Sequence, residues 1–464
     1  MEIRFAGAAR EVTGSCHVVR VNGKTILLDC GLFQGRRHEV EQKNRRLPYA
    51  PDQIDAVVLS HAHIDHAGRL PYLVKEGFRG RIHSTLATRG LCEVMLADSA
   101  HIQEKDAEFL HRHRKSAVEP LYALRDVSST LLQMTPHRYR DRFEVVPGIS
   151  ATFLDAGHIL GSASVVLEWK EGATVRRLGF SGDVGRSGLA IIRDPEPPAG
   201  LDWVVMESTY GDRDHESVDG ARAELARIVR ETAARGGRIL IPAFAVGRTQ
   251  ELLYDLHELA RADKIPRLPI FVDSPLANEA TAVFRDNTAD FDETEALVRR
   301  YAGRRDELFN FDLVQFTPSV DESKAIMRMP GPVIVIAASG MVESGRILHH
   351  LAHSAGDQKN TILIVGFQAE HTLGRRIVER RPLIKVFGDE LPLRARVEVL
   401  TGYSAHADRM GLQRWLDAVR AASPVLQDVF LVHGEPRAQD ALAAQLAAKG
   451  YAVQCPEPWA NVTR

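Results

Sequence analysis

The stretch IDAVVLSHAHIDHAGRL, residues 54–70, decides the fold of this chain. It begins as an apolar run of strand length and ends abruptly in His61, His63, Asp65 and His66. Imidazole nitrogens and carboxylate oxygens are ligands that zinc and similar divalent ions take in proteins. A strand that feeds a turn can present such side chains together, so the spacing H-x-H-x-D-H indicates a metal site. It offers more ligands than one tetrahedral ion needs from a single loop, and we therefore expect two ions.

A cluster of histidines can also arise on a solvated loop without any function. Here the spacing, the preceding buried-strand pattern and the small residues Ala62, Ala67 and Gly68 agree with one another. We therefore favour the metal site.

Three further segments extend this pattern. Asp29 closes an earlier strand in TILLDCG, His158 lies in LDAGHILGS, and Asp183 lies in LGFSGDVG. With these residues in this order, the chain resembles the metallo-β-lactamase superfamily. The resemblance implies an αββα sandwich.

Composition limits the class of protein. A chain of 464 residues exceeds one ordinary core, and 44% hydrophobic with 26% charged residues describes a globular protein, so we expect two domains. No apolar run reaches the length of a membrane span, and the first residues, MEIRFAGAAREVTGS, lack a signal-peptide pattern, so we expect no membrane association and a cytoplasmic location. The four cysteines show no C-x-x-C spacing, which argues against a disulfide framework or a thiolate zinc site.

The net charge of −2 argues against a uniformly basic surface for nucleic acid. Arginine nevertheless outnumbers lysine and forms local clusters, such as Arg299 to Arg305 and Arg375 to Arg381. Guanidinium groups suit phosphates, but solvated helix faces paired with acidic residues explain such clusters as well.

The order of elements predicts an interrupted domain. Residues 1–30 contain short strands with an Asn22-Gly23 hairpin turn, and strands return at 149–155, 162–169 and 174–181. From about Gly211 strands and helices alternate, which is typical of a parallel sheet covered on both faces. We expect residues 1–210 and 392–464 to form one domain, with an inserted αβα domain at 211–391.

The insertion and three further motifs resemble the β-CASP nucleases. The motifs correspond to Glu207 in VVMESTYG, His406 in GYSAHAD and His433 in FLVHGE. Segments such as IPAFAVGRTQE and AASGMVESGRILHHL also look like those of prokaryotic members. The resemblance covers essentially the whole chain.

This resemblance implies two Zn²⁺ ions per chain, although the same ligands also accept Mn²⁺. One ion would be held by His61, His63 and His158. The other would be held by Asp65, His66 and His433. Asp183 would bridge the two ions.

The resemblance also implies the chemistry. The two ions would activate a water to hydroxide, which attacks phosphorus. His406 would be the general acid that protonates the leaving oxygen, and Glu207 would orient it and raise its pKa. Asp65 counts among the catalytic residues as well as the ligands, and Asp29 would tie a ligand imidazole into place.

Two features outside these motifs each allow two interpretations. Ser339-Gly340 follows a strand and precedes a helix, so its backbone N–H groups can bind a substrate phosphate, but tight packing explains this glycine equally well. His371 matches no ligand motif, and both a surface position and a substrate contact are open.

We therefore expect a zinc-dependent ribonuclease that hydrolyses single-stranded RNA in RNA processing or degradation. RNA-directed members of the family carry a histidine at the last motif, as His433 does here, which makes a DNA-directed nuclease the alternative. A small-molecule thioester or lactam hydrolase has no need of the insertion, and a scaffold without activity would not keep every ligand. Endonuclease or 5′-exonuclease action stays open, as does a homodimer.

Overall fold

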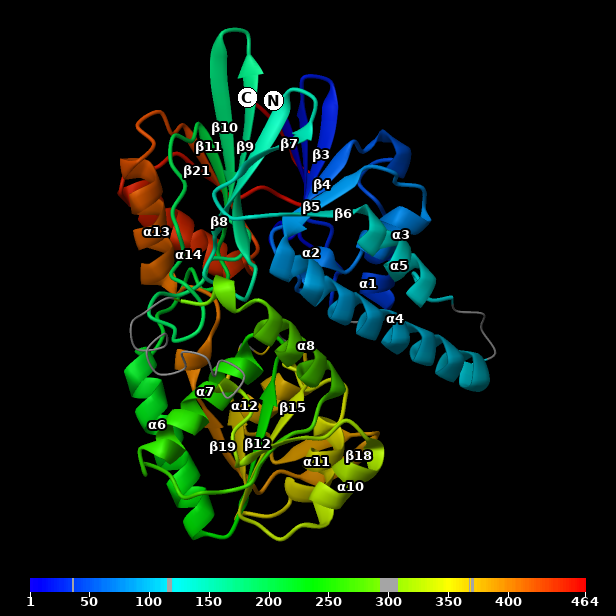
Figure 1. The fold of residues 1–464 in the computed structure, drawn as a ribbon, viewed down its shortest axis with the longest axis vertical. Coiled ribbons are helices and arrows are strands. Elements are labelled where there is room, and N and C mark those ends of the chain that lie inside the picture. Colours follow the sequence, from blue (N-terminus) through cyan, green and yellow to red (C-terminus); the bar gives the residue numbers. More distant parts are fainter. Residues whose placement is uncertain (36, 115–118, 293–307, 367, 369–370) are drawn as a thin grey trace. The chain divides into compact units, whose positions relative to one another are not determined.

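The fold is given by a computed structural model that describes residues 1–35, 37–114, 119–292, 308–366, 368 and 371–464. It divides into two compact units, and Figure 1 labels many of their elements. Unit 1 consists of Met1–Ser187, Ile192–Asp214 and His406–Arg464, and unit 2 consists of Gly188–Ile191 and His215–Ala405. The predicted arginine cluster at 299–305 lies outside the described residues.

Unit 1 is built on two seven-stranded sheets. The first has the order β22-β1-β2-β3-β4-β5-β6 and the second the order β21-β20-β11-β10-β9-β8-β7. The strands of the first sheet are β1 (Glu2–Gly7), β2 (Cys16–Val21), β3 (Lys24–Leu28), β4 (Ala56–Val58), β5 (Arg81–Thr85), β6 (Met134–His137) and β22 (Asn461–Thr463). The strands of the second are β7 (Arg142–Val146), β8 (Ile149–Asp155), β9 (Ala163–Glu171), β10 (Thr174–Phe180), β11 (Trp203–Glu207), β20 (Asp428–Val432) and β21 (Val453–Gln454).

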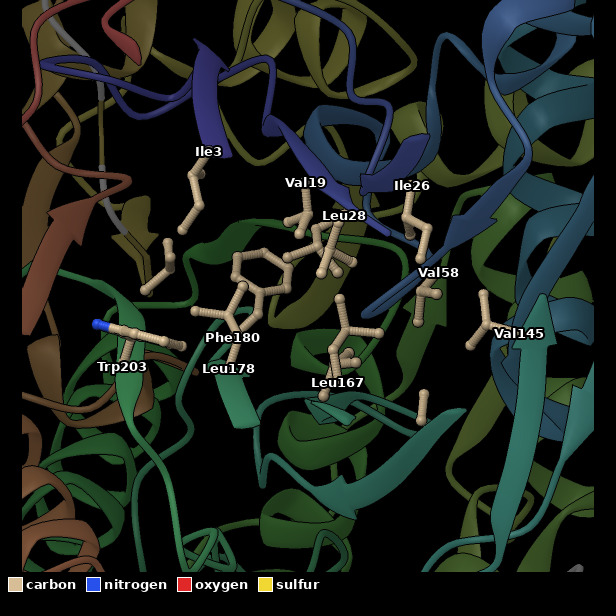
Figure 2. Packing of buried hydrophobic residues seen from close by; sticks show 14 of the residues in the cluster. Ile3, Val19, Ile26, Leu28, Val58, Val145, Leu167, Leu178, Phe180 and Trp203 are labelled. Carbon is tan, nitrogen blue, oxygen red and sulfur yellow. The ribbon is translucent and has the colours of Figure 1, made fainter. Parts of the chain in front are cut away.

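The core of unit 1 lies between these sheets. Ile26 and Val58 from the first sheet pack into one buried cluster with Leu167 and Phe180 from the second, as Figure 2 shows. Alternate residues of a strand point to opposite faces of its sheet. A strand with apolar residues on both faces, such as β11, therefore contributes to two hydrophobic clusters. Trp203 and Val205 of β11 join the inner cluster, and Val204 and Met206 join an outer one.

Helices cover the outer faces of both sheets. In Figure 1, α13 and α14 lie on one side and α3, α4 and α5 on the other, which confirms the predicted αββα sandwich. The helices of unit 1 are α1 (Arg37–Arg45), α2 (Ile64–Ala67), α3 (Leu70–Lys75), α4 (Leu86–Arg114), α5 (Leu124–Gln133), α13 (Arg409–Ala421) and α14 (Pro436–Ala448). A 3₁₀ turn, η1, spans Pro51–Gln53.

The predicted hairpin turn at Asn22-Gly23 is confirmed. Val21 pairs with Lys24 across the β2–β3 ladder, and both turn residues have positive φ, +50° for Asn22 and +72° for Gly23. Asparagine and glycine tolerate this left-handed conformation, which matches the twist of a two-residue hairpin.

Unit 2 contains a six-stranded sheet of order β14-β13-β15-β12-β16-β19, in which every neighbouring pair is parallel. This confirms the predicted parallel sheet. Its strands are β12 (Arg238–Ala243), β13 (Ile270–Val272), β14 (Val314–Phe316), β15 (Val333–Ala338), β16 (Thr361–Ile364) and β19 (Arg396–Val399). Strand β19, which lies beyond the predicted end of the insertion at residue 391, completes this sheet.

Helices and one further hairpin surround this sheet in the described part of unit 2. The helices are α6 (Val218–Ala234), α7 (Arg248–Arg261), α8 (Pro275–Asp286), α10 (Val320–Arg328), α11 (Ile347–Ser354) and α12 (Leu373–Val378). The 3₁₀ turns are η2 (Thr288–Asp290) and η4 (Thr401–Tyr403), and the antiparallel hairpin is formed by β17 (Leu383–Val386) and β18 (Asp389–Pro392). None of the helices in the described part of the chain combines the length and apolar character that crossing a membrane requires.

Candidate metal centre

The H-x-H-x-D-H motif follows β4 and enters the short helix α2. His61 and His63 lie on the connecting loop, and Asp65 and His66 lie on α2. Because a helix of four residues has little stability of its own, backbone bonds from neighbouring loops hold it: Ser15 N donates to Asp65 O (2.8 Å) and Cys30 N to His66 O (2.8 Å). The motif is therefore fixed by the segments around residues 15 and 30.

Glycine at position 31 allows this close approach. A Cβ there would lie 1.6 Å from the carbonyl oxygen of Asp65. No other residue fits without moving α2, and with it two of the candidate ligands.

Four side chains of unit 1 form a first group of candidate ligands: His61, His63, His158 and Asp183. Nδ1 of His63 lies 3.1 Å from Nε2 of His61 and 3.2 Å from Nε2 of His158. Oδ2 of Asp183, which follows β10, lies 3.5 Å from Nε2 of both His61 and His158.

A second group lies beside the first and consists of Asp65, His66 and His433. Nε2 of His66 and Nε2 of His433 are 3.1 Å apart, and Oδ2 of Asp65 lies 3.6 Å from the latter. Oδ2 of Asp183 is also 3.3 Å from Nε2 of His66. One carboxylate oxygen of Asp183 therefore faces both groups.

These distances fit metal ligands. Zinc bonds of about 2.0–2.1 Å in a tetrahedron place neighbouring ligand atoms about 3.3 Å apart, close to the separations within both groups. Two imidazole nitrogens that face each other cannot both donate, and a cation between them removes this conflict. The residues present therefore suit divalent metal ions.

The protonation of these imidazoles agrees with metal binding. Burial lowers the pKa of His61 and His158 well below the ordinary value, and lowers the pKa of His63 to about 4, so all three are neutral. Neutral imidazole is the form that coordinates metals. Burial alone would lower the pKa of His66 too, but Asp183 and Asp29 outweigh it and raise that pKa, so an ion that binds here displaces a proton.

Asp29 lies against His66. Its Oδ2 is 2.7 Å from Nδ1 of His66 and accepts from the hydroxyls of Ser15 and Ser60, each at 3.0 Å. Its Oδ1 accepts from the backbone N–H of Ser60 at 2.8 Å. With Nδ1–H bound to this carboxylate, His66 presents Nε2 to the second group.

Glu207 and His406 form a pair beside the ligands. Nδ1 of His406 lies 3.1 Å from Oε1 of Glu207, and that carboxylate also accepts from the backbone N–H of Val184 (2.6 Å) and Thr209 (3.2 Å). Burial alone would lower the pKa of His406, but the charges of Glu207 and Asp183 outweigh it and raise this pKa to about 9. His406 is therefore protonated near neutral pH and can donate a proton.

Ser339, Gly340 and His371 lie in unit 2, whereas the candidate ligands and the Glu207–His406 pair all lie in unit 1. The Ser339 hydroxyl accepts from Glu343 N (3.1 Å) and Ser344 N (3.4 Å), and a Cβ at Gly340 would meet the ring of Phe244 at 2.5 Å. These contacts fit the tight-packing interpretation of both residues, and the phosphate contact stays a proposal.

His371 is exposed and has φ of +68°. It is not part of any metal-holding group among the described residues.

Thr209 contacts the candidate ligand His433, and no sequence motif identified it. It is buried, and its hydroxyl lies 3.1 Å from Nδ1 of His433 and 3.1 Å from the His433 carbonyl oxygen. Its only signal in the sequence is its place two residues after Glu207, since a threonine at the end of a strand is too common to indicate a site.

Three family models match consecutive parts of the chain. The metallo-beta-lactamase superfamily model matches residues 9–232, the Beta-Casp domain matches 249–377, and the Zn-dependent metallo-hydrolase RNA specificity domain matches 390–456.

Curated relatives match over nearly the whole chain. Ribonuclease TTHA0252 of Thermus thermophilus is 38% identical over 98% of this chain and 97% of its own length. Transcription termination factor FttA of Methanocaldococcus jannaschii is 31% identical over 94% of this chain and 67% of its own length. Endoribonuclease ysh1 of Schizosaccharomyces pombe is 31% identical over 97% of this chain and 56% of its own length.

Among solved structures, a protein of unknown function from Enterococcus faecalis V583 covers 99% of both chains with a TM-score of 0.56 and 12% identity. This likeness concerns the fold alone.

Proposed function

The chain belongs to the β-CASP family of the metallo-β-lactamase superfamily, and from this we propose that it is a metal-dependent ribonuclease that hydrolyses phosphodiester bonds of RNA. One observation carries the proposal. Oδ2 of Asp183 lies 3.5 Å from Nε2 of His61 in the first group and 3.3 Å from Nε2 of His66 in the second, and Nδ1 of His406 lies 3.9 Å from the same oxygen.

The donor sets suit two Zn²⁺ ions, and Mn²⁺ is also compatible with nitrogen and oxygen ligands. The first ion would be held by His61, His63 and His158, and the second by Asp65, His66 and His433. Asp183 would contribute to both. Bound ions there supply a hydroxide nucleophile near neutral pH and neutralise charge on the phosphoryl oxygens.

Side chains of this chain donate the proton and orient the imidazoles. His406 donates a proton to the leaving ribose oxygen, and Glu207 holds the imidazole by Nδ1, so that Nε2 carries the donated proton. Asp29 fixes His66 with Nε2 toward the second group. A ring anchored at one nitrogen and reactive at the other is the arrangement that acid catalysis by histidine needs.

The proposed substrate is RNA, and we propose that it is bound as a single strand. The relatives are named as a ribonuclease and an endoribonuclease, and the model that matches the C-terminal residues is described as an RNA specificity domain. In unit 2, Ser339 and Gly340 are retained as candidate phosphate contacts. A homodimer and the cytoplasmic location stay predictions.

A cleavage assay with matched polymers tests this substrate class. Zinc-loaded protein is given a single-stranded RNA and the DNA of the same sequence, each labelled at the 5′ end or the 3′ end, and a small thioester. Cleavage of the RNA by wild type and its loss in Asp183→Asn support the proposal. On RNA labelled at the 5′ end, an endonuclease first releases labelled oligonucleotides, whereas a 5′-exonuclease releases labelled mononucleotides. Cleavage of DNA alone, or of the thioester alone, would overturn the RNA assignment.

A further inference from the structure

His433 reaches the second ligand group from an unusual backbone position. It follows the buried strand β20 and has φ of +48°, a conformation that residues other than glycine rarely adopt. Its N–H donates to Ala8 O at 2.6 Å, and its carbonyl accepts from Ser208 N at 3.1 Å. The backbone is thus fixed on both sides, which leaves the ring's orientation and tautomer to be set by side-chain contacts.

The hydroxyl of Thr209 makes two contacts with this one residue. It is 3.1 Å from the carbonyl oxygen of His433 and 3.1 Å from Nδ1 of the same residue. A hydroxyl has a single proton, and a carbonyl oxygen can only accept. Thr209 therefore donates to the carbonyl and accepts from Nδ1–H, which is the one assignment that satisfies both contacts.

This assignment determines which ring nitrogen of His433 can coordinate a metal ion. With the proton on Nδ1, the lone pair lies on Nε2, the nitrogen that faces His66 at 3.1 Å and Asp65 at 3.6 Å. Oδ1 of Asp183, 3.4 Å from Nδ1, is a more distant acceptor for the same N–H. In the opposite tautomer Nε2 would carry a proton and could not coordinate an ion.

We propose that Thr209 is a positioning residue that holds His433 in the Nδ1–H tautomer and thereby supports the second metal ion and not the first. The inference rests on the proposed two-ion site. Among the described residues, Thr209 forms side-chain hydrogen bonds with His433 and with none of His61, His63 and His158. Its backbone N–H, which binds Glu207 at 3.2 Å, is unchanged by substitution of the side chain.

Three substitutions distinguish the effect of the Thr209 hydroxyl from the effects of its methyl group and of the adjacent hydroxyl of Ser208. Thr209→Val keeps the shape and removes the hydroxyl, and Thr209→Ser keeps the hydroxyl and removes the methyl group. Ser208→Ala is the matched control, because the adjacent buried hydroxyl donates to Val432 O at 2.7 Å and contacts no imidazole. His66→Ala serves as the reference for loss of the second ion.

The measurement is Zn²⁺ binding by metal-free protein in competition with a chromophoric chelator, with thermal unfolding followed by circular dichroism as the check on folding. We expect two ions in wild type, one in His66→Ala, and a second ion held about 10- to 100-fold more weakly in Thr209→Val, with the first unchanged. Thr209→Ser and Ser208→Ala should bind both ions as wild type does.

Other outcomes overturn the inference in distinguishable ways. If Thr209→Val binds both ions with wild-type affinity, or if Thr209→Ser is weakened as much as Thr209→Val, the hydroxyl does not position His433. If wild type and His66→Ala bind the same number of ions, the two-ion premise itself is wrong.

Discussion

Nδ1 of His406 lies 3.1 Å from Oε1 of Glu207, and the two residues differ sharply in exposure: the imidazole is 19% exposed, whereas the carboxylate is fully buried. Glu207 is held by backbone N–H groups at both oxygens, so its position does not depend on His406. A fixed buried charge therefore stabilises the protonated form of an imidazole that still reaches solvent.

Replacing Glu207 by glutamine should change the pH dependence of RNA cleavage. His406 must be protonated to donate, so activity falls as pH rises through its pKa, and the charge of Glu207 raises that pKa. Glu207→Gln keeps an oxygen acceptor and removes the charge, so the basic limb of log(kcat/KM) against pH should move to lower pH by about one unit or more.

His406→Ala provides the control for this profile, because it should lose both the limb and most of the activity. A basic limb at the same pH in wild type and Glu207→Gln would mean that another group titrates there. Metal content measured on each sample excludes a change in bound ions as the cause.

A buried carboxylate in unit 2 gives a second prediction, on stability. Asp273 accepts from Thr317 (2.8 Å), Ser323 (2.6 Å) and Arg346 (2.8 Å), and lies 2.7 Å from Nε2 of His350. Burial alone would raise its pKa, but these bonds outweigh it and lower the pKa to about 2. Because the pKa is depressed on folding, the stabilisation is complete above the unfolded value of about 3.9 and is lost as pH falls toward 2.

Denaturant unfolding of wild type and Asp273→Asn measures this contribution. The charge should contribute about 2 kcal/mol at neutral pH, so the difference in unfolding free energy should shrink by that amount as pH falls below about 4. A difference that stays constant down to the lowest pH at which both proteins fold would contradict the assignment.

Two buried tyrosines that donate hydrogen bonds of equal length to carboxylates of different exposure give a third prediction. Tyr403 donates to Asp255 and Tyr451 to Asp417, each at 2.6 Å. The side chain of Asp255 is 7% exposed and that of Asp417 is 48% exposed. Arg222 still binds Oδ1 of Asp255 in Tyr403→Phe, but the buried Oδ2 loses its tyrosine donor, which should cost about 2 kcal/mol. Tyr451→Phe should cost about 0.5 kcal/mol, because water replaces the lost bond at the exposed Asp417. Equal losses in chemical denaturation would show that burial does not decide the cost.

Local pattern was sufficient for much of this fold. The strand at 149–155 is β8 with the predicted bounds, and alternation of strands and helices after Gly211 predicted the parallel sheet. The spacing of His61, His63, Asp65 and His66 predicted that these side chains lie together, since all four lie on one loop and one helical turn.

Contacts between distant segments could not be derived in this way. His66 and His433 are 367 residues apart in sequence, and only the family resemblance placed them in one ligand group. Thr209 was missed because its role depends on the ring of His433 and on no pattern around residue 209. Strand β19 was assigned outside the insertion because its pairing with β16 is set by the sheet and not by its own sequence.

RNA cleavage with metal content determined on the same samples tests the central claim most directly. Zinc-loaded wild type, His66→Ala and His406→Ala are given a labelled single-stranded RNA, and bound zinc is counted by mass spectrometry. The account predicts two ions and cleavage in wild type, one ion and no cleavage in His66→Ala, and two ions with cleavage lost in His406→Ala. Full cleavage by His406→Ala would contradict the proton-donor role, and full zinc content in His66→Ala would contradict the two-ion site.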